Sequence, residues 1–182
     1  MDKFGIGQPV PRTEDAKHLT GRGRFVDDIA LPGECHGYVL RSPHAHAKIN
    51  SLDLSRARSA PGFLLVWTAK DCHKAGLSKL PYIYPLAPSW SLDRLHNPGR
   101  FSLAEDRVRY VGDGVVFIVA ETLNQAKDAA ELIDIDYHPL GSVVATVDAT
   151  NPDSPRIWED CPNNITFCHT VGDPEATEKV FA

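Results

Sequence analysis

The fold is decided by Arg107-Val-Arg-Tyr-Val111, followed by Val115-Val-Phe-Ile-Val-Ala120 and by residues 122–139. Polar and apolar side chains alternate over 107–111, which is typical of a strand with one buried face. The run 115–120 is continuously apolar, so we expect a central strand covered on both faces. These two segments predict a sheet as the framework of the domain.

A helix follows the apolar strand. Thr122 is a suitable N-cap, and Gln125 lies three residues further on, as a capping box requires. One face at helical spacing carries Leu123, Ala126, Ala130 and Ile133. Alternation returns over 134–138 and ends at Pro139. This strand–helix–strand order predicts a mixed α/β domain, with helices packed on a mixed sheet.

Shorter elements precede this region. Residues 35–40 and 47–54 suit strands, and the second would bury one face through Ala47, Ile49 and, after a slip in the alternation, Leu52 and Leu54. We expect a short helix over 55–60, capped by Ser55 and stopped by Pro61-Gly62. The compact apolar run 63–67 has the size of a buried strand. One or two helical turns over 69–75 would end at Gly76.

The remaining segments are less regular. Residues 1–24 are rich in Gly, Pro and charge and indicate an extended arm before a domain over 25–147. The Pro-rich segment 77–104 is either an interaction surface or a variable insertion. In the trailing region 148–182, a strand over 164–169 and a helix over 174–182, capped by Asp173, are the expected elements.

Charge and hydropathy narrow the class of protein. The 182 residues carry a net charge of −5, and 42% are hydrophobic, an ordinary globular composition. The sequence has no cluster of basic residues that would suit a nucleic-acid surface. The nearest arginines are separated by other residues, and they are Arg22, Arg24, Arg56 and Arg58. With no apolar run long enough to span a membrane and no signal core, we expect a cytoplasmic protein that contacts neither membrane nor nucleic acid.

His44 and His46 are the first candidates for chemistry. Two residues apart in a strand, they would share a face and could chelate a metal ion. A catalytic zinc needs a third ligand, and His36 or Asp53 follows no known ligand spacing. We therefore expect a structural or surface role for the pair and keep a His-ligated metal enzyme as an alternative.

The other candidates are weaker. The glycine pairs at 21/23 and 112/114 complete no phosphate-binding motif and indicate turns. The carboxylates of Asp27 and Asp28 point apart in an extended chain, and those of Asp134 and Asp136 share the wet face of a strand with His138. The cysteines are expected to be free thiols, namely Cys35, Cys72, Cys161 and Cys168. No catalytic, cofactor-binding or metal residue is assigned from this pattern.

Several short motifs occur in an order that resembles one family. They are Gly7-Gln-Pro-Val-Pro-Arg-Thr-Glu-Asp15, Leu19-Thr-Gly-Arg-Gly-Arg-Phe-Val-Asp-Asp28, Arg41-Ser-Pro-His-Ala-His-Ala47, Pro61-Gly62, Arg107-Val-Arg-Tyr-Val-Gly112 and Asp128-Ala-Ala-Glu-Leu-Ile-Asp-Ile-Asp-Tyr137. Collinear over residues 5–182, they resemble the N-terminal α/β-hammerhead domain of the large subunit of the xanthine dehydrogenase, aldehyde oxidase and carbon monoxide dehydrogenase family, the molybdenum hydroxylases.

The resemblance implies an oxidoreductase in which this region has a structural and subunit-contact role. In the family the large subunit binds molybdopterin, often as its cytosine dinucleotide, while separate subunits carry two [2Fe–2S] clusters and usually FAD. The catalytic residues lie downstream of the hammerhead, so none is placed here, and residues 148–182 would be the linker and start of the molybdopterin-binding domain. The implied partners are that domain or subunit, the iron–sulfur subunit and a flavin subunit.

Two alternatives stay open beside this interpretation, and the first is the His-ligated metal enzyme described above. The chain would also suit a stand-alone module that binds a small molecule and derives from the hammerhead.

Where many relatives have Glu-Pro, this sequence has Asp113-Gly114, and we expect a looser turn there because glycine lacks the rigidity of proline. The substrate is chosen by residues elsewhere.

Overall fold

A computed structural model describes residues 7, 9, 11–80, 96, 98–161, 163–167 and 172–182. The chain divides into two compact units, Met1–Glu34 and Cys35–Ala182. No helix in the described part is both long and apolar enough to cross a membrane. Much of the expected loop 77–104, and part of the expected strand 164–169, lie outside the described residues.

The first unit is not extended throughout. It contains helix α1 (Asp15–Leu19) and the 3-10 turn η1 (Val26–Asp28). The Asp15 carboxylate accepts a hydrogen bond from the backbone N–H of Arg12 at 3.1 Å. The ring of His18 stacks on that of Phe25 with 4.9 Å between centroids. Helix α1 thus interrupts the extended arm expected over 1–24, at residues beyond the glycines and prolines of 5–11.

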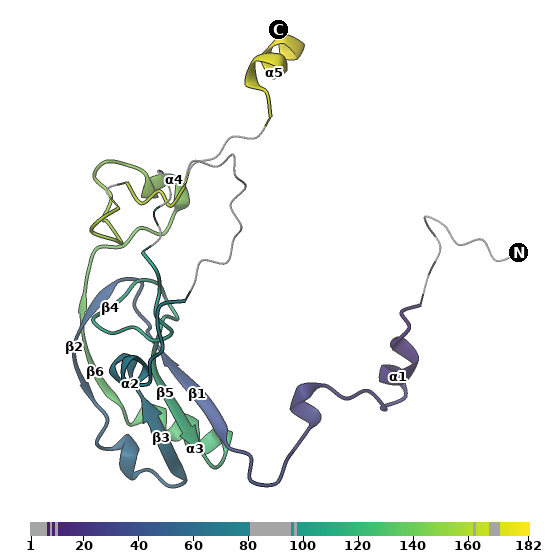
Figure 1. Ribbon diagram of the computed structural model, residues 1–182, viewed down its shortest axis with the longest axis vertical. Coiled ribbons are helices and arrows are strands. Elements are labelled where there is room, and N and C mark those ends of the chain that lie inside the picture. Colours follow the sequence, from purple (N-terminus) through teal and green to yellow (C-terminus); the bar gives the residue numbers. More distant parts are fainter. Residues whose placement is uncertain are drawn as a thin grey trace, which may run out of the picture. The chain divides into compact units, whose positions relative to one another are not determined.

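The second unit contains two sheets, each with three described strands (Figure 1). One has the order β1-β5-β3, from β1 (His36–Arg41), β5 (Gly114–Ala120) and β3 (Phe63–Trp67). The other has the order β4-β2-β6, from β4 (Arg107–Val108), β2 (Ala47–Asp53) and β6 (Asp134–Pro139). The four strand pairs among the described residues are antiparallel, so in this part of the chain two antiparallel sheets replace the expected mixed sheet.

The helices cover the central strand β5 on both faces, as its apolar run predicts. Helix α3 (Leu123–Glu131) contacts β1 and β5, and its alanines share a buried cluster with Val116 and Ile118. On the other face Phe117 packs against a cluster that includes Cys72 of helix α2 (Ala69–Lys74). The first cluster also holds Ala47 and Val108 of the second sheet, so the core lies between the two sheets and α3.

Most local predictions of secondary structure are confirmed. The slip expected in β2 is a register shift between Ile49 and Ser51, which keeps Leu52 and Leu54 in the core. The Thr122 hydroxyl accepts a hydrogen bond from the Gln125 backbone N–H at 3.3 Å, and Gly76 has a φ of 80° after α2. Among the residues expected on the buried face of α3, only Leu123 differs, being 42% exposed at the first turn.

Four predictions of local structure are wrong. The strand expected over 107–111 is reduced to β4, which ends at Val108. The segment after β2 forms the 3-10 turn η2 (Ala57–Ser59) without a cap from Ser55. Strand β3 lies at a sheet edge, so Leu64 remains 49% exposed. The described residues 164–167 form no strand, because Asn164 has a φ of 56°, outside the extended region.

Two further helices lie near the end of the chain. They are α4 (Thr146–Ala149) and α5 (Pro174–Phe181). Helix α5 begins as expected, because Asp173 Oδ1 accepts a hydrogen bond from Ala176 N–H at 3.0 Å and Pro174 occupies the first position.

Candidate functional site

His44 and His46 lie in the connection before β2 and not within a strand. The Nδ1 atom of His46 is 2.8 Å from the carbonyl oxygen of Gly141, and its side chain is almost fully buried. The ring of His44 lies 4.9 Å from that of Tyr137, tilted by 55°. Both imidazoles therefore contact the chain at or just beyond β6.

The proposed third ligands do not complete a metal site. Among the described residues, no group of three or more His, Cys, Asp or Glu side chains is placed to hold a metal ion. The Asp53 carboxylate accepts a hydrogen bond from the Ser55 backbone N–H at 2.9 Å, and that bond is the main reason why its pKa lies below the ordinary value. His36 lies in β1, in the other sheet.

The carboxylate pairs also have structural surroundings. The Asp28 carboxylate accepts a hydrogen bond from Phe25 N–H at 2.9 Å, and that of Asp136 accepts one from the Asn50 amide at 3.1 Å. In β6, Asp134, Asp136 and His138 are all exposed, as the alternation predicts. The described cysteines Cys35, Cys72 and Cys161 are not in disulfides.

The Gly112–Gly114 turn is held by the segment that begins at Arg41. The Ser42 N–H donates to Asp113 O, and the Gly112 N–H donates to Ser42 O, both at 2.8 Å. Arg41 Nη1 donates to Gly112 O at 2.8 Å. A side chain at Gly114 would place its Cβ 3.1 Å from Val39 Cγ1. These bonds hold the turn although proline is absent, and the looseness expected from Asp113-Gly114 stays a prediction.

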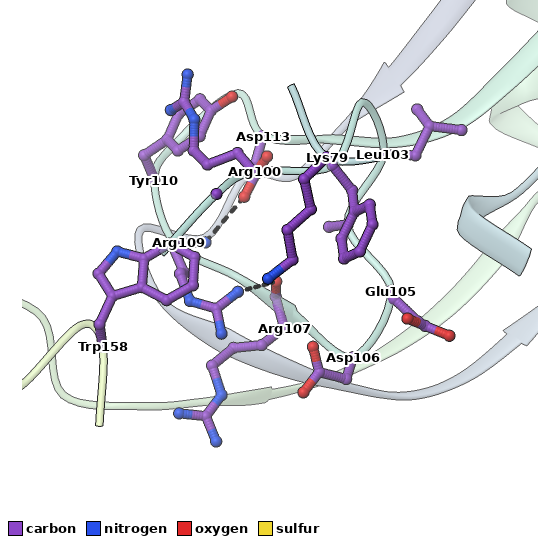
Figure 2. Close-up of a pocket in the computed structure, with 13 residues that line it drawn as sticks. Lys79, Arg100, Leu103, Glu105, Asp106, Arg107, Arg109, Tyr110, Asp113 and Trp158 are labelled. Carbon is purple, nitrogen blue, oxygen red and sulfur yellow. Dashed lines mark hydrogen bonds between the residues drawn. The ribbon is translucent and has the colours of Figure 1, made fainter. Parts of the chain in front are cut away.

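A cavity of about 230 Å³ beside this turn is the most chemically distinctive feature of the described chain. We call it the cation–aromatic cavity, because three cations on its wall each lie over an aromatic ring. The pairs are Lys79 over Phe101 at 5.5 Å, Arg100 over Tyr110 at 5.4 Å and Arg109 over Trp158 at 3.9 Å from the ring centroid. Figure 2 labels the three cations together with Tyr110 and Trp158. Such pairs hold a cation without neutralising it.

Arg107 and Arg109 enter the cavity from one short segment. Two residues apart at β4, they share a side of the chain. Arg107 Nη2 donates to Glu159 Oε1 at 3.1 Å, and Arg109 Nη1 donates to Arg107 O at 3.4 Å. Burial lowers the pKa of the Arg109 guanidinium, and the charge of nearby Asp106 opposes that effect. The guanidinium still remains charged at neutral pH.

Sequence reasoning missed this cavity. The arginines singled out as a basic group, Arg22, Arg24, Arg56 and Arg58, do not line it. Its wall comes instead from Lys79, the segment 99–113 and Trp158. The one local signal was the Arg107-Val-Arg109 spacing, which places two cations on one side of a strand.

The comparisons with known proteins identify the domain. The family model described as "Aldehyde oxidase and xanthine dehydrogenase, a/b hammerhead domain" matches residues 20–141. The carbon monoxide dehydrogenase large chain of Afipia carboxidovorans is 34% identical over 98% of this chain and 22% of its own length. The nicotine 6-hydroxylase large subunit of Paenarthrobacter nicotinovorans is 40% identical over 76% of this chain and 16% of its own length.

Solved structures agree with this result. A Cu,Mo-CO dehydrogenase in its carbon monoxide reduced state matches 97% of this chain and 22% of its own, with a TM-score of 0.72 and 34% identity. Quinoline 2-oxidoreductase from Pseudomonas putida 86 matches 91% of this chain and 20% of its own, also with a TM-score of 0.72 and 34% identity.

The fold is therefore that of an α/β-hammerhead domain, and the fold class expected from the sequence is confirmed. The chain belongs to the aldehyde oxidase and xanthine dehydrogenase family. It spans about a fifth of the length of the relatives just described.

Proposed function

We propose that this chain is the N-terminal hammerhead portion of the large subunit of a molybdenum-cofactor-dependent hydroxylase or dehydrogenase. Its role is structural: it forms contacts with the rest of the large subunit and with partner subunits. The observation that carries this proposal is the alignment of 98% of the chain with a carbon monoxide dehydrogenase large chain of which it covers 22%.

The cofactors of the whole enzyme belong to the same proposal. Molybdopterin or its cytosine dinucleotide would lie in the large subunit and supply the oxidation of substrate, with [2Fe–2S] clusters and FAD on partner subunits. The described residues of this chain do not fit as molybdenum ligands, since none gather into a ligand group and His46 Nδ1 bonds Gly141 O. We therefore assign the chain no catalytic step, and we place the enzyme in the cytoplasm.

Exposed apolar side chains support the contact role. Leu64 and Leu65 on the edge strand β3 are 49% and 39% exposed. Val180 and Phe181 at the end of α5 are more than four-fifths exposed. Apolar side chains that are exposed at a sheet edge or a helix end are suited to burial in a contact with another domain.

A chimera tests the proposal. In the large chain from Afipia carboxidovorans, the segment aligned with this chain would be replaced by residues 1–182. We expect the chimera to assemble with its partner subunits, retain molybdenum by elemental analysis and oxidise carbon monoxide, because substrate choice lies outside the exchanged segment.

The control is the same large chain with the segment deleted. Loss of assembly and of molybdenum in the deleted chain, with both restored in the chimera, is the expected pattern. A deleted chain that assembles, retains molybdenum and turns over substrate as the parent does would refute the structural role.

A further inference from the structure

The cation–aromatic cavity has unused hydrogen-bond donors. The Nε atoms of Arg107 and Arg109 are buried and have no partner within the described part of the chain. The Arg107 side chain is only 14% exposed. Buried guanidinium N–H groups are nearly always paired, so an unpaired pair beside a cavity indicates a missing acceptor.

Trp158 limits the movement of the Arg109 guanidinium. At 3.9 Å from the ring centroid the cation lies directly over the indole, and Figure 2 shows the two groups at the side of the hollow. A guanidinium held in this way loses little further freedom when it binds a ligand. The site is therefore pre-organised for an acceptor that lies in the guanidinium plane.

The charge of the wall limits which acceptor fits. Four cations line the cavity among the described residues, Lys79, Arg100, Arg107 and Arg109, against three carboxylates, Glu105, Asp106 and Asp113. Arg107 is already paired with Glu159 at 3.1 Å, so the other three cations face three carboxylates and the wall has no excess charge. Asp113 Oδ2 already accepts the Arg109 backbone N–H at 3.0 Å, so that carboxylate is held by a neutral donor.

We propose that the cation–aromatic cavity binds a carboxylate group, which Arg109 receives on its Trp158 platform and Arg100 and Lys79 flank. A carboxylate has two coplanar oxygens that match the guanidinium fork. Its single negative charge would pair with Arg109, which forms no ion pair with a described residue. A phosphate dianion would face the three wall carboxylates at greater electrostatic cost, so the cavity selects carboxylate over phosphate. This site is independent of the proposed function.

Side-chain NMR of the 182-residue chain tests the site. The arginine Nε–Hε signals would be followed during titration with acetate and, separately, with inorganic phosphate, at constant ionic strength kept with chloride. We expect the Arg109 signal to move saturably with acetate and to respond at least about tenfold more weakly to phosphate. An Arg109 signal that does not saturate with acetate, or that prefers phosphate, overturns the proposal.

Variants assign the response to the cavity. R109K keeps the charge and loses the planar fork, so acetate should bind at least about tenfold more weakly, as followed on the Arg107 signal. R56K is the matched control, because Arg56 is exposed and does not line the cavity, and it should titrate like the parent. Thermal unfolding would verify that R109K is folded, and W158F, which keeps an aromatic platform, should retain acetate binding. Unchanged acetate binding by a folded R109K would overturn the assignment.

The source of the carboxylate is resolved by a third titration. A capped Gly-Glu-Gly peptide presents the group as a protein side chain does. Peptide binding at least as tight as that of acetate supports a glutamate of a neighbouring polypeptide as the ligand, and binding of acetate alone supports a free acid. Failure of both to bind refutes the site while leaving the outcome of the chimera experiment untouched.

Discussion

The imidazole of His46 donates from Nδ1 to the carbonyl oxygen of Gly141 across 2.8 Å and so joins the entrance of β2 to the chain beyond β6. A carbonyl oxygen only accepts, so Nδ1 carries the proton. The backbone reinforces the link, since Leu140 N–H donates to His46 O at 2.9 Å. His46, which was a candidate metal ligand together with His44, instead joins two segments of the second unit.

His46→Ala should lower the free energy of unfolding by about 2 to 4 kcal/mol, because it leaves the Gly141 carbonyl unpaired and opens a void at a side chain that is only 5% exposed. Chemical denaturation measures the loss. His46→Asn keeps an N–H donor close to the Nδ1 position and should recover part of it.

His138→Ala is the control for that substitution. His138 is exposed on β6, so its loss should change stability by less than about 0.5 kcal/mol.

A chelator should leave the denaturation midpoint of the parent chain unchanged. A midpoint that falls on chelation and rises again with zinc would return His46 to the role of a metal ligand.

Asp71 stabilises the start of α2 through its charge. Its Oδ2 accepts hydrogen bonds from the Thr68 backbone N–H at 2.8 Å and the Thr68 hydroxyl at 2.7 Å, and these bonds lower the pKa of the carboxyl below 3.8. Since the folded pKa is below the unfolded one, the contribution to stability is complete above the unfolded value. It is lost as pH falls through the folded pKa.

Asp71→Asn should therefore cost about 1 kcal/mol at pH 7, in the range of a lost helix cap, and the difference from the parent should shrink below pH 4. Urea denaturation at a series of pH values measures this. Asp128→Asn is the control, because Asp128 is exposed on α3. A cost that stays constant down to pH 2 would mean that the carboxylate charge is not the cause.

The elements predicted well from sequence are those whose cause is local. The apolar run of β5, the Thr122 cap of α3 and the Asp173 cap of α5 all depend on residues within one or two turns of each other. Strand order is not local. Residues 63–67 have the composition of a buried strand, yet β3 lies at a sheet edge, which only its pairing with β5 decides.

The cavity illustrates the same limit for the site. Arg109 and Trp158 are far apart in the sequence, and the loop that contains Trp158 is held by hydrogen bonds between residues 7 to 15 positions apart. Asn164 donates to Ala149 O at 2.9 Å and to Pro155 O at 3.0 Å, and accepts from Ile157 N–H at 3.1 Å. In the sequence Asn164 is one of two adjacent asparagines, and nothing local distinguishes it for such a role.

Ile118 tests the importance of the central strand. Its side chain is fully buried in β5 and belongs to the cluster shared by the two sheets and α3. Ile118→Val should cost about 1 kcal/mol and Ile118→Ala about 2 to 5 kcal/mol, as measured by chemical denaturation. Val144→Ala, at a residue that is 92% exposed, should change stability by less than about 0.5 kcal/mol. Equal effects at the two positions would contradict the assignment of the core.

Glycine is required at position 62 both by the backbone conformation and by the packing of a neighbouring side chain. Its φ is +70°, and a Cβ there would lie within 2.5 Å of the Gln125 side-chain amide. Gln125 Oε1 accepts the Thr122 hydroxyl at 2.9 Å, so the amide cannot move aside without losing that bond at the start of α3. Gly62→Ala should therefore cost about 2 to 3 kcal/mol, part from the left-handed backbone and part from the lost bond.

Gly76→Ala separates the two parts of that cost. Gly76 has a φ of +80° and open space around its Cα, so its substitution should show the backbone cost alone, about 1 to 2 kcal/mol. In a Gln125→Ala background the excess cost of Gly62→Ala over Gly76→Ala should disappear, because no amide then lies in the way of the Cβ. A double-mutant cycle measured by chemical denaturation gives the coupling. An excess that persists without the Gln125 side chain would show that Gly62 is required by its backbone or by another neighbour.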